Sequence, residues 1–389
     1  MNLQRIYLDH AATTPMRREV TEAMRDALLE SNYNPSSLHD EGRRARALLE
    51  GARERVAAVL GASRNEITFT SGGTEANNVA LFGVARAASP GARLVASRIE
   101  HHSVLAPLER LHDEGYEVSL LAVGSDGLVE PASFADALGR PALLASVMYA
   151  NNEIGTVQPI GELAAIARRR GVLFHSDAVQ APTWLSLDVR KLGVDLLSIS
   201  AHKFGGPRGV GVLYVRRGVP ITPILLGGGQ EFGRRSGTEN VSGAVGLARA
   251  LELAAAEQPD RSREVAGLRD RLESGIRSAI SDVTVNGGTA PRLANNLNVS
   301  LLGSDSAAML IALDLAGIAA SAGSACASGT LEPSHVLEAI GLDEPSRKAA
   351  IRFSLGSATT PAEIERAVDV LPSIIANLRA ARLVTRRDG

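Results

Sequence analysis

The sequence predicts an α/β protein with two domains: a large domain built on a mainly parallel sheet flanked by helices, and a smaller α+β C-terminal domain. Its dominant pattern is a short apolar run, then a turn rich in Gly, Ser, Asn or His, then a helical stretch. Such alternation favours parallel strands, because a helix between two strands brings the chain back so that the next strand runs in the same direction as the previous one. The 389 residues are enough for two or three domains.

Six apolar runs predict the strands of the large domain, and four helical stretches lie between most of them. The predicted strands span residues 67–70, 93–97, 143–149, 172–175, 196–200 and 211–215. The predicted helices span residues 43–60, 74–88, 104–114 and 160–170. A short glycine-rich link joins the last two strands, so this pair fits a parallel crossover less well than the others.

The boundary between the domains is predicted near residue 257. A helical segment over residues 241–256 is followed by the polar stretch 257–264, which contains Pro259. Polar stretches with proline are typical of linkers. The large domain is therefore assigned residues 15–256, and the small domain residues 1–14 and 257–389. In the small domain the pattern predicts helices over residues 265–280, 307–316 and 361–381 and strands over residues 295–301 and 350–354.

The charge balance gives no reason to expect a nucleic-acid or membrane partner. The chain carries 41 basic and 43 acidic residues, for a net charge of −2, whereas nucleic-acid binding requires a basic surface. The longest uncharged stretch, residues 315–331, is mostly Gly, Ala and Ser and is too weakly apolar to span a membrane. We therefore expect a cytoplasmic protein.

Cys326 is the only cysteine in the chain. A single thiol cannot form an intrachain disulfide, which fits a reducing compartment, and it cannot build a cysteine-based zinc or iron–sulfur site. The glycine-rich motifs of dinucleotide- and nucleotide-binding folds are absent, as is the H-E-x-x-H zinc motif. We expect no resident metal.

Residues that directly follow the predicted strands are the first candidates for a site, because open α/β sheets bind ligands at the carboxyl ends of their strands. Gly73 and Thr74 follow the strand 67–70 and open a helix, where free backbone N–H groups and a hydroxyl suit a phosphate. An ordinary helix cap with a glycine turn would explain the same residues. His101 follows the strand 93–97 and could be either a polar cap or a catalytic group.

Lys203 is the most informative candidate. It follows the strand 196–200 in a chain that has only two other lysines, Lys191 and Lys348. A lysine in such a place can keep its amine available for a covalent bond to a carbonyl group. Asp177, 26 residues earlier, also ends a strand, although a helix cap is an equal alternative for it. Together with the phosphate turn, an amine and a carboxylate are the groups that pyridoxal phosphate (PLP) requires.

Nine segments, in order and along nearly the whole chain, resemble the cysteine desulfurases, which are PLP-dependent enzymes of aminotransferase class V. They are YLDHAATTP (7–15), FTSGGTEANN (69–78), EHHSV (100–104), ANNEIGTVQPI (150–160), HSDAVQ (175–180), SAHKFGGPRGVG (200–211), GGGQEFGRRSGTEN (227–240), SAGSACASGTLEPSHVL (321–337) and IRFSLG (351–356). The resemblance implies a fold-type I PLP-dependent transferase whose large domain binds the cofactor. It also implies a homodimer.

The resemblance implies a role for each matching residue around the cofactor. Lys203 corresponds to the lysine that bonds to the cofactor, and His101 to the histidine stacked on its ring. Asp177 corresponds to the partner of the pyridine nitrogen, and Gln180 to the residue that faces the ring hydroxyl. The residues implied to bind the phosphate are Gly73, Thr74, Ser200, His202 and Thr238, the last of which reaches the site of the partner subunit.

The resemblance further implies that Asn152 and Arg352 bind the carboxylate of the substrate, L-cysteine, and that Cys326 is the nucleophile that takes its sulfur. The small residues around Cys326 independently predict an exposed loop, where a free thiol is a liability unless it is used. The implied reaction gives L-alanine and a persulfide on Cys326. The segment 321–337 is similar to that of the long-loop group, which passes sulfur to acceptor proteins such as an iron–sulfur scaffold.

Two alternatives stay open at this point. Another class V enzyme, such as a cysteine lyase or an aminotransferase, would share Lys203 and Asp177 but would not need Cys326. A non-catalytic sulfur carrier or scaffold would need no cofactor. Selenocysteine is a further candidate substrate.

Overall fold

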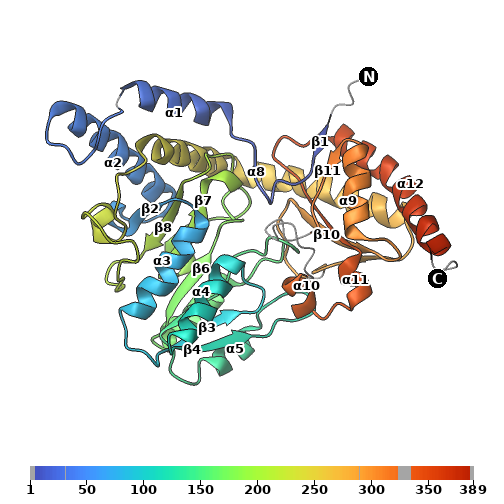
Figure 1. Cartoon of the computed structure of the whole chain (residues 1–389), viewed down its shortest axis with the longest axis horizontal. Helices are drawn as coiled ribbons and strands as arrows, with labels where there is room; N and C mark the ends of the chain where they lie inside the picture. The colour runs from blue at the N-terminus through green and yellow to red at the C-terminus, as the bar shows by residue number, and fades with distance from the viewer. Residues whose placement is uncertain (1–4, 31, 289, 323–333, 386–389) are drawn as a thin grey trace.

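The chain, seen in a computed structural model, has two parts joined by one long helix, α8 (Val241–Ala279) (Figure 1). The structure describes residues 5–30, 32–288, 290–322 and 334–385. The first half of α8 packs into the core of the larger part, through residues such as Leu247 and Leu251. Its second half packs into the core of the smaller part, through residues such as Leu272 and Ile276.

The larger part is built on a seven-stranded sheet with the strand order β2-β8-β7-β6-β5-β3-β4. Its strands are β2 (Ile67–Thr70), β3 (Arg93–Ser97), β4 (Glu117–Leu121), β5 (Leu144–Ser146), β6 (Leu173–Asp177), β7 (Leu196–Ser200) and β8 (Gly211–Val215). All pairs from β7 to β4 are parallel, and β8 is antiparallel to both of its neighbours. The predicted mainly parallel sheet is therefore confirmed, and the glycine-rich link before β8 is too short for a parallel crossover.

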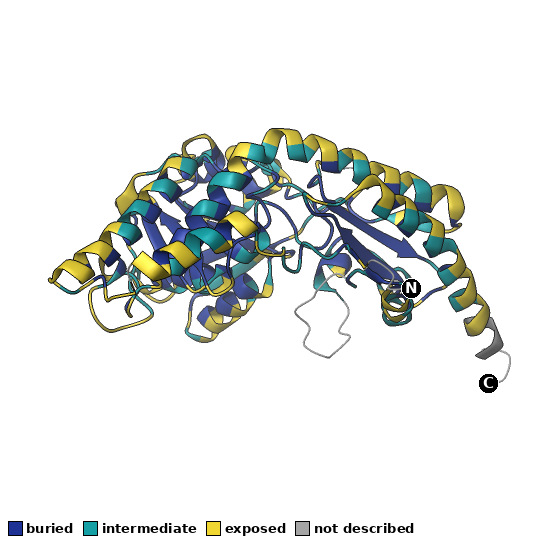
Figure 2. Ribbon diagram, turned by 90° about the horizontal axis from the view of Figure 1, so that it is seen from above, coloured by how far each residue is buried: buried dark blue, intermediate teal, exposed yellow. Residues whose placement is uncertain are grey.

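Helices cover both faces of this sheet. In β8, Val212 and Tyr214 face one core, and Leu213 and Val215 face the other, as the two-residue period of a strand requires. The first core lies under α1 (Arg18–Glu30), α2 (Asp40–Leu60), α6 (Ile160–Arg169) and the start of α8. The second lies under α3 (Gly73–Arg86) and α4 (His102–Asp113). Figure 2 shows the strands buried between helices whose outer faces are exposed.

The smaller part contains a three-stranded antiparallel sheet in the order β12-β10-β9. Its strands are β9 (Val283–Val285), β10 (Asn296–Leu301) and β12 (Ala350–Ser354), and a separate pair joins β1 (Ile6–Tyr7) in parallel to β11 (Ile318–Ala319). Helices α9 (Ser306–Leu315) and α12 (Pro361–Thr385) pack on this sheet together with α8. Shorter helices are α5 (Pro131–Ala137), α7 (Val189–Leu192), α10 (His335–Ala339) and α11 (Glu344–Lys348).

The polar stretch 257–264, predicted to be a linker, is instead helical and lies in the middle of α8. The stretch is polar because its side chains face solvent or hydrogen-bond to polar groups of the larger part, and the helix is not interrupted there. Glu257 accepts two hydrogen bonds from Arg17, at 2.7 and 3.0 Å, and Gln258 and Ser262 both donate to the backbone oxygen of Trp184. The division into residues 15–256 against residues 1–14 and 257–389 stays a proposal.

Candidate active site

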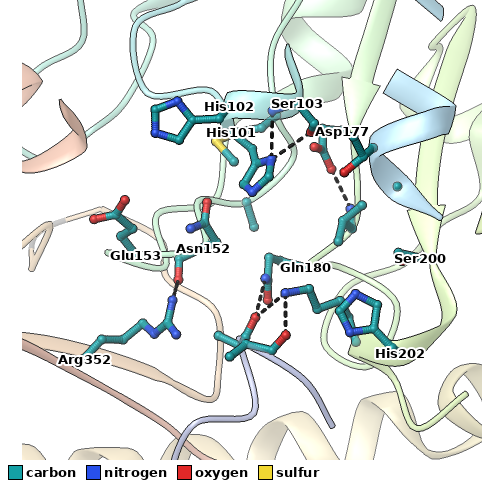
Figure 3. A pocket seen from close by; sticks show the side chains of 18 of the residues that line it. His101, His102, Ser103, Asn152, Glu153, Asp177, Gln180, Ser200, His202 and Arg352 are labelled. Carbon is teal, nitrogen blue, oxygen red and sulfur yellow. Dashed lines mark hydrogen bonds between the residues drawn. The ribbon is translucent and has the colours of Figure 1, made fainter. Parts of the chain in front are cut away.

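Ten of the predicted site residues line one cavity of about 200 Å³ at the carboxyl ends of the parallel strands. The larger part contributes most of its wall, and the smaller part contributes Arg352 of β12 and His335 of α10. Figure 3 shows how the side chains converge. The predicted residues on the wall are Gly73, Thr74, His101, Asn152, Asp177, Gln180, Ser200, His202, Lys203 and Arg352.

The glycine turn between β2 and α3 forms one end of this cavity. Gly72 has a φ of 155°, which residues with a side chain rarely adopt. A Cβ atom on Gly73 would lie only 2.7 Å from Cγ2 of Val179, so this turn packs directly against the chain that follows β6. Gly73 and Thr74, the first two residues of α3, line the cavity, so the N-terminus of this helix borders it, as a phosphate site requires.

Lys203 ends the short helical turn Ala201–Lys203, which directly follows Ser200, the last residue of β7. Its Nζ donates to the backbone oxygens of Ala11 and Ala12, at 2.6 and 2.8 Å. Gln180 donates to the same oxygen of Ala11 at 3.0 Å. The N-terminal segment thus orients both the amine and the amide that project into the cavity.

His202, the neighbour of Lys203, is a neutral group at pH 7. Burial lowers its pKa to about 4, and the positive charges of Lys203 and Arg208 act in the same direction. Its Nδ1 lies 3.2 Å from Oγ1 of Thr13. His202 can therefore bind a phosphate through a hydrogen bond but adds no positive charge.

Asp177 is the last residue of β6, and His101 lies between β3 and α4. Asp177 is 5% exposed, and its Oδ1 accepts from the backbone N–H of Val179 at 2.9 Å. His101 caps α4, where its Nδ1 accepts from the backbone N–H of Ser103 at 3.0 Å. Burial lowers the pKa of His101, which makes the neutral imidazole the dominant form at pH 7.

Arg352 comes from the middle of β12 and is 1% exposed. Its guanidinium donates to the backbone oxygen of Asn152 at 2.8 Å and to Oδ1 of Asp9 at 2.7 Å. Asn152 lies in the loop after β5, so one guanidinium connects three segments that are distant in sequence. A guanidinium held in this way on a cavity wall suits the carboxylate of an amino acid.

Two predicted site residues are not on this wall. Thr238 is exposed and lines a separate hollow together with Tyr33 and Asn240, so its assignment to a partner's site stays a prediction. Cys326 lies outside the described residues.

Several residues of the cavity had no predicted role. They are Ala11, Ala12, His102, Ser103, Met148, Ala150, Glu153, Val179 and His335. Most belong to the segments that resemble the desulfurases, but nothing in their residue types or spacing separated them from residues of the core.

The groups of this wall fit PLP. Lys203 supplies a primary amine, Asp177 a buried carboxylate, and His101 a flat neutral ring, while the N-terminus of α3 offers N–H groups beside the hydroxyls of Thr74 and Ser200. Among the described residues, no cluster of three or more His, Cys, Asp or Glu side chains could hold a metal ion. No helix in the described part of the chain is long and apolar enough to cross a membrane.

The fold and the site together define an α/β enzyme of the PLP-dependent class. Residues 6–367 match the family model described as aminotransferase class-V. The chain is 48% identical over 375 residues to the cysteine desulfurase IscS of Dictyoglomus turgidum, across 96% of this chain and 95% of that protein. The chain belongs to the class-V aminotransferase family and, within it, to the cysteine desulfurases, whose members depend on PLP.

Solved structures agree with this assignment. A NifS-like protein has a TM-score of 0.90 and 37% identity, with 96% of this chain and 100% of that chain covered. A structure described as SspA in complex with cysteine has a TM-score of 0.80 and 34% identity, with 91% and 100% covered.

Proposed function

We propose that this chain is a PLP-dependent cysteine desulfurase that converts L-cysteine to L-alanine and takes the sulfur as a persulfide on Cys326. The observation that carries the proposal is the meeting of Lys203, Asp177 and Arg352 on one cavity wall. An amine, a carboxylate and a guanidinium in one cavity suit a PLP reaction on an amino acid. A desulfurase relative that shares 48% of the residues over nearly the whole length supports cysteine as that amino acid.

Each residue of the cavity has a separate role in the proposed reaction. When bound, PLP supplies an electrophilic carbon for the amino group of the substrate and a protonated ring that draws electrons from its Cα. Asp177 would keep a proton on the ring nitrogen, and Arg352 with Asn152 would hold the substrate carboxylate. Lys203 would hold the cofactor, and its amine would carry protons to and from Cα of the substrate.

The sulfur step belongs to Cys326. Its thiolate attacks the sulfur of the substrate, a new S–S bond forms, and the C–S bond of the substrate breaks. The electron pair of the C–S bond stays with the carbon skeleton, which is released as alanine after protonation. His101 is a neutral ring on the cavity wall and can exchange a proton near the reacting sulfur.

A homodimer and a sulfur-acceptor protein, such as an iron–sulfur scaffold, are the proposed partners. Exposed large side chains near Thr238 favour a dimer interface at this place. Leu28 is 48% exposed and Tyr33 54%, and both line the same hollow as Thr238. Sedimentation should give the mass of a dimer, and a stable active monomer would contradict the proposal. We place the reaction in the cytoplasm, because a single reactive thiol needs a reducing compartment.

The test compares wild type, Cys326→Ser and Lys203→Ala after brief exposure to L-cysteine. Wild type should form alanine and carry one added sulfur on the Cys326 peptide by mass spectrometry. Cys326→Ser should still bind cofactor and cysteine but make almost no alanine, because neither binding step uses the thiol. Lys203→Ala should lose the visible absorbance of the lysine-bound cofactor, whereas Lys191→Ala, an exposed lysine on α7, should keep it.

A Cys326→Ser enzyme that makes alanine at the wild-type rate would contradict the desulfurase reaction and favour a cysteine lyase. A protein that binds no cofactor would contradict both enzymes.

A further inference from the structure

Two buried polar side chains contact Asp177 and His101 and have no role so far: Asn77, which does not line the cavity, and Ser103, which does. Asn77 on α3 is completely buried, and Ser103 on α4 is 8% exposed. The amide nitrogen of Asn77 lies 2.7 Å from Oδ2 of Asp177 and 2.8 Å from Oγ of Ser103. Oγ of Ser103 lies 2.8 Å from Nδ1 of His101. The four side chains form one continuous chain of hydrogen bonds.

The chemistry of the end groups sets the direction of these hydrogen bonds. A carboxylate accepts and does not donate, so the amide nitrogen of Asn77 must face Asp177. A reversed amide would place two oxygens together. The second N–H of Asn77 donates to Oγ of Ser103. Nδ1 of His101 accepts the backbone N–H of Ser103 and so carries no proton, and the contact between Oγ and Nδ1 must therefore be donated by the serine hydroxyl.

His101 receives this hydroxyl at the same nitrogen that accepts the backbone N–H of Ser103 at 3.0 Å. A nitrogen that accepts carries no proton, so the neutral ring carries its proton on Nε2. Figure 3 shows Nδ1 directed at Ser103 and the opposite end of the ring turned toward the cavity.

The charged and titratable groups around His101 are compatible with a neutral ring. Burial lowers its pKa most, Asp177 raises it, and Lys203, His102 and His335 lower it. These groups come from the segments that pack around the ring, β6, the turn after β7, α4 and α10.

We propose that Asn77 and Ser103 are positioning residues, which tie Asp177 to His101 and hold His101 in the tautomer whose Nε2–H points into the cavity. Neither side chain is assigned contact with the substrate. The use of this N–H in sulfur transfer rests on the proposed function. The tautomer itself does not, because it follows from contacts within the chain.

The first test is ¹⁵N NMR of the cofactor-loaded enzyme labelled at histidine, with His101 assigned by comparison with His101→Gln. The expected signals are those of a neutral ring with its proton on Nε2 at pH 7. A proton on Nδ1, or a charged ring at that pH, would overturn the proposal. The readout needs no turnover, so an enzyme without desulfurase activity would refute the proposed function and leave this inference standing.

The second test follows the titration of His101 in two variants of Ser103. Ser103→Ala removes a donor to Nδ1, which stabilises the neutral ring, so the midpoint should rise by about half a pH unit to one unit. Ser103→Thr keeps the hydroxyl and should return the midpoint to the wild-type value. A matched control is Ser300→Ala, because Ser300 is also buried and accepts from an asparagine, Asn286, at 2.9 Å. An unchanged midpoint in Ser103→Ala would show that Ser103 does not position His101.

Discussion

Arg53 in the larger part and Arg352 in the smaller part are the two bulkiest side chains that the described structure buries almost completely, at 2% and 1% exposure. Arg53 donates to both carboxylate oxygens of Glu231, at 2.7 and 2.8 Å, and to the backbone oxygen of Ile67. Its guanidinium also lies 4.9 Å from the ring centre of Phe69 and 5.0 Å from that of Phe232. Arg53 therefore ties α2 to β2 and to the loop at Glu231.

Arg352 donates to Asp9 and to the backbone oxygen of Asn152 at similar distances, 2.7 and 2.8 Å, but it also lines the active-site cavity. We propose that the same side chain type has two uses in this protein. A guanidinium surrounded by carboxylate, carbonyl and rings stabilises the fold, whereas one that also borders a cavity can bind a ligand. Burial of a charge alone does not identify a functional residue.

The comparison predicts its largest effect for Arg53→Met. The substitution leaves the carboxylate of Glu231 buried without its cation, and breaking such a pair costs about 3 to 5 kcal/mol of unfolding free energy. Urea unfolding of the cofactor-loaded enzyme measures this loss. The KM for cysteine in the folded enzyme should change little, since Arg53 does not line the active-site cavity. A variant as stable as wild type would show that the ion pair does not stabilise the fold.

Arg352→Lys should have the opposite pair of effects: a large decrease in kcat/KM for cysteine and a small change in the free energy of unfolding. Lysine keeps the positive charge but cannot hold a carboxylate through two parallel N–H groups. We expect kcat/KM for cysteine to fall about 10- to 100-fold, mainly through a higher KM. Arg347→Lys on α11, which does not line the cavity, serves as the control. An unchanged KM would remove Arg352 from the substrate site.

The third prediction concerns the effect of the buried His175 on the pH dependence of stability. Burial lowers the pKa of His175 to about 3, far below its ordinary value near 6.5. The folded state therefore keeps His175 neutral while the unfolded chain takes up a proton below pH 6.5, so stability is lost as the pH falls. Between about pH 7 and about pH 5, this one group should cost roughly 2 kcal/mol of unfolding free energy.

The matched variant is His175→Gln, which can still hydrogen-bond between Ser146 and Ser198 but does not titrate. It should be less stable than wild type at neutral pH and should lose less stability on acidification. If both proteins lose the same amount in urea unfolding at the two pH values, His175 does not contribute to acid sensitivity.

The smallest effect is expected for an ion pair on the surface. Lys348 and Glu344 are bonded across one turn of α11, with 59% and 62% of their side chains exposed. Exposed pairs of this kind contribute little, because water and salt screen them. Lys348→Ala should leave both the unfolding midpoint and the visible absorbance of the cofactor unchanged. A measurable loss of either would mean that burial is a poor guide to which charges matter here.

Much of the larger part could be predicted from the sequence. The strands β2, β3, β7 and β8 begin and end where the apolar runs do, because a buried strand is encoded locally by a short apolar run between turn residues. The edge strand β4 was missed, since most of its residues are only partly buried and its pattern is weak. The composition of the polar middle of α8 predicts a linker where the structure has a helix, because exposed helical residues and linker residues have similar compositions.

The groups of the candidate site could be predicted from the sequence, because a glycine turn, a carboxylate and an amine come at the ends of the strands β2, β6 and β7, and open α/β sheets bind ligands at the carboxyl ends of their strands. The surroundings of those groups depend on the packing of elements that are distant in sequence. Arg352 comes from the middle of a strand in the smaller part, and the carbonyls of Ala11 and Ala12 come from the N-terminal segment. The link from Asp177 through Asn77 and Ser103 to His101 joins three elements. Such contacts depend on how distant elements pack. The spacing of apolar residues along the chain predicts single helices and strands, and it does not predict these contacts.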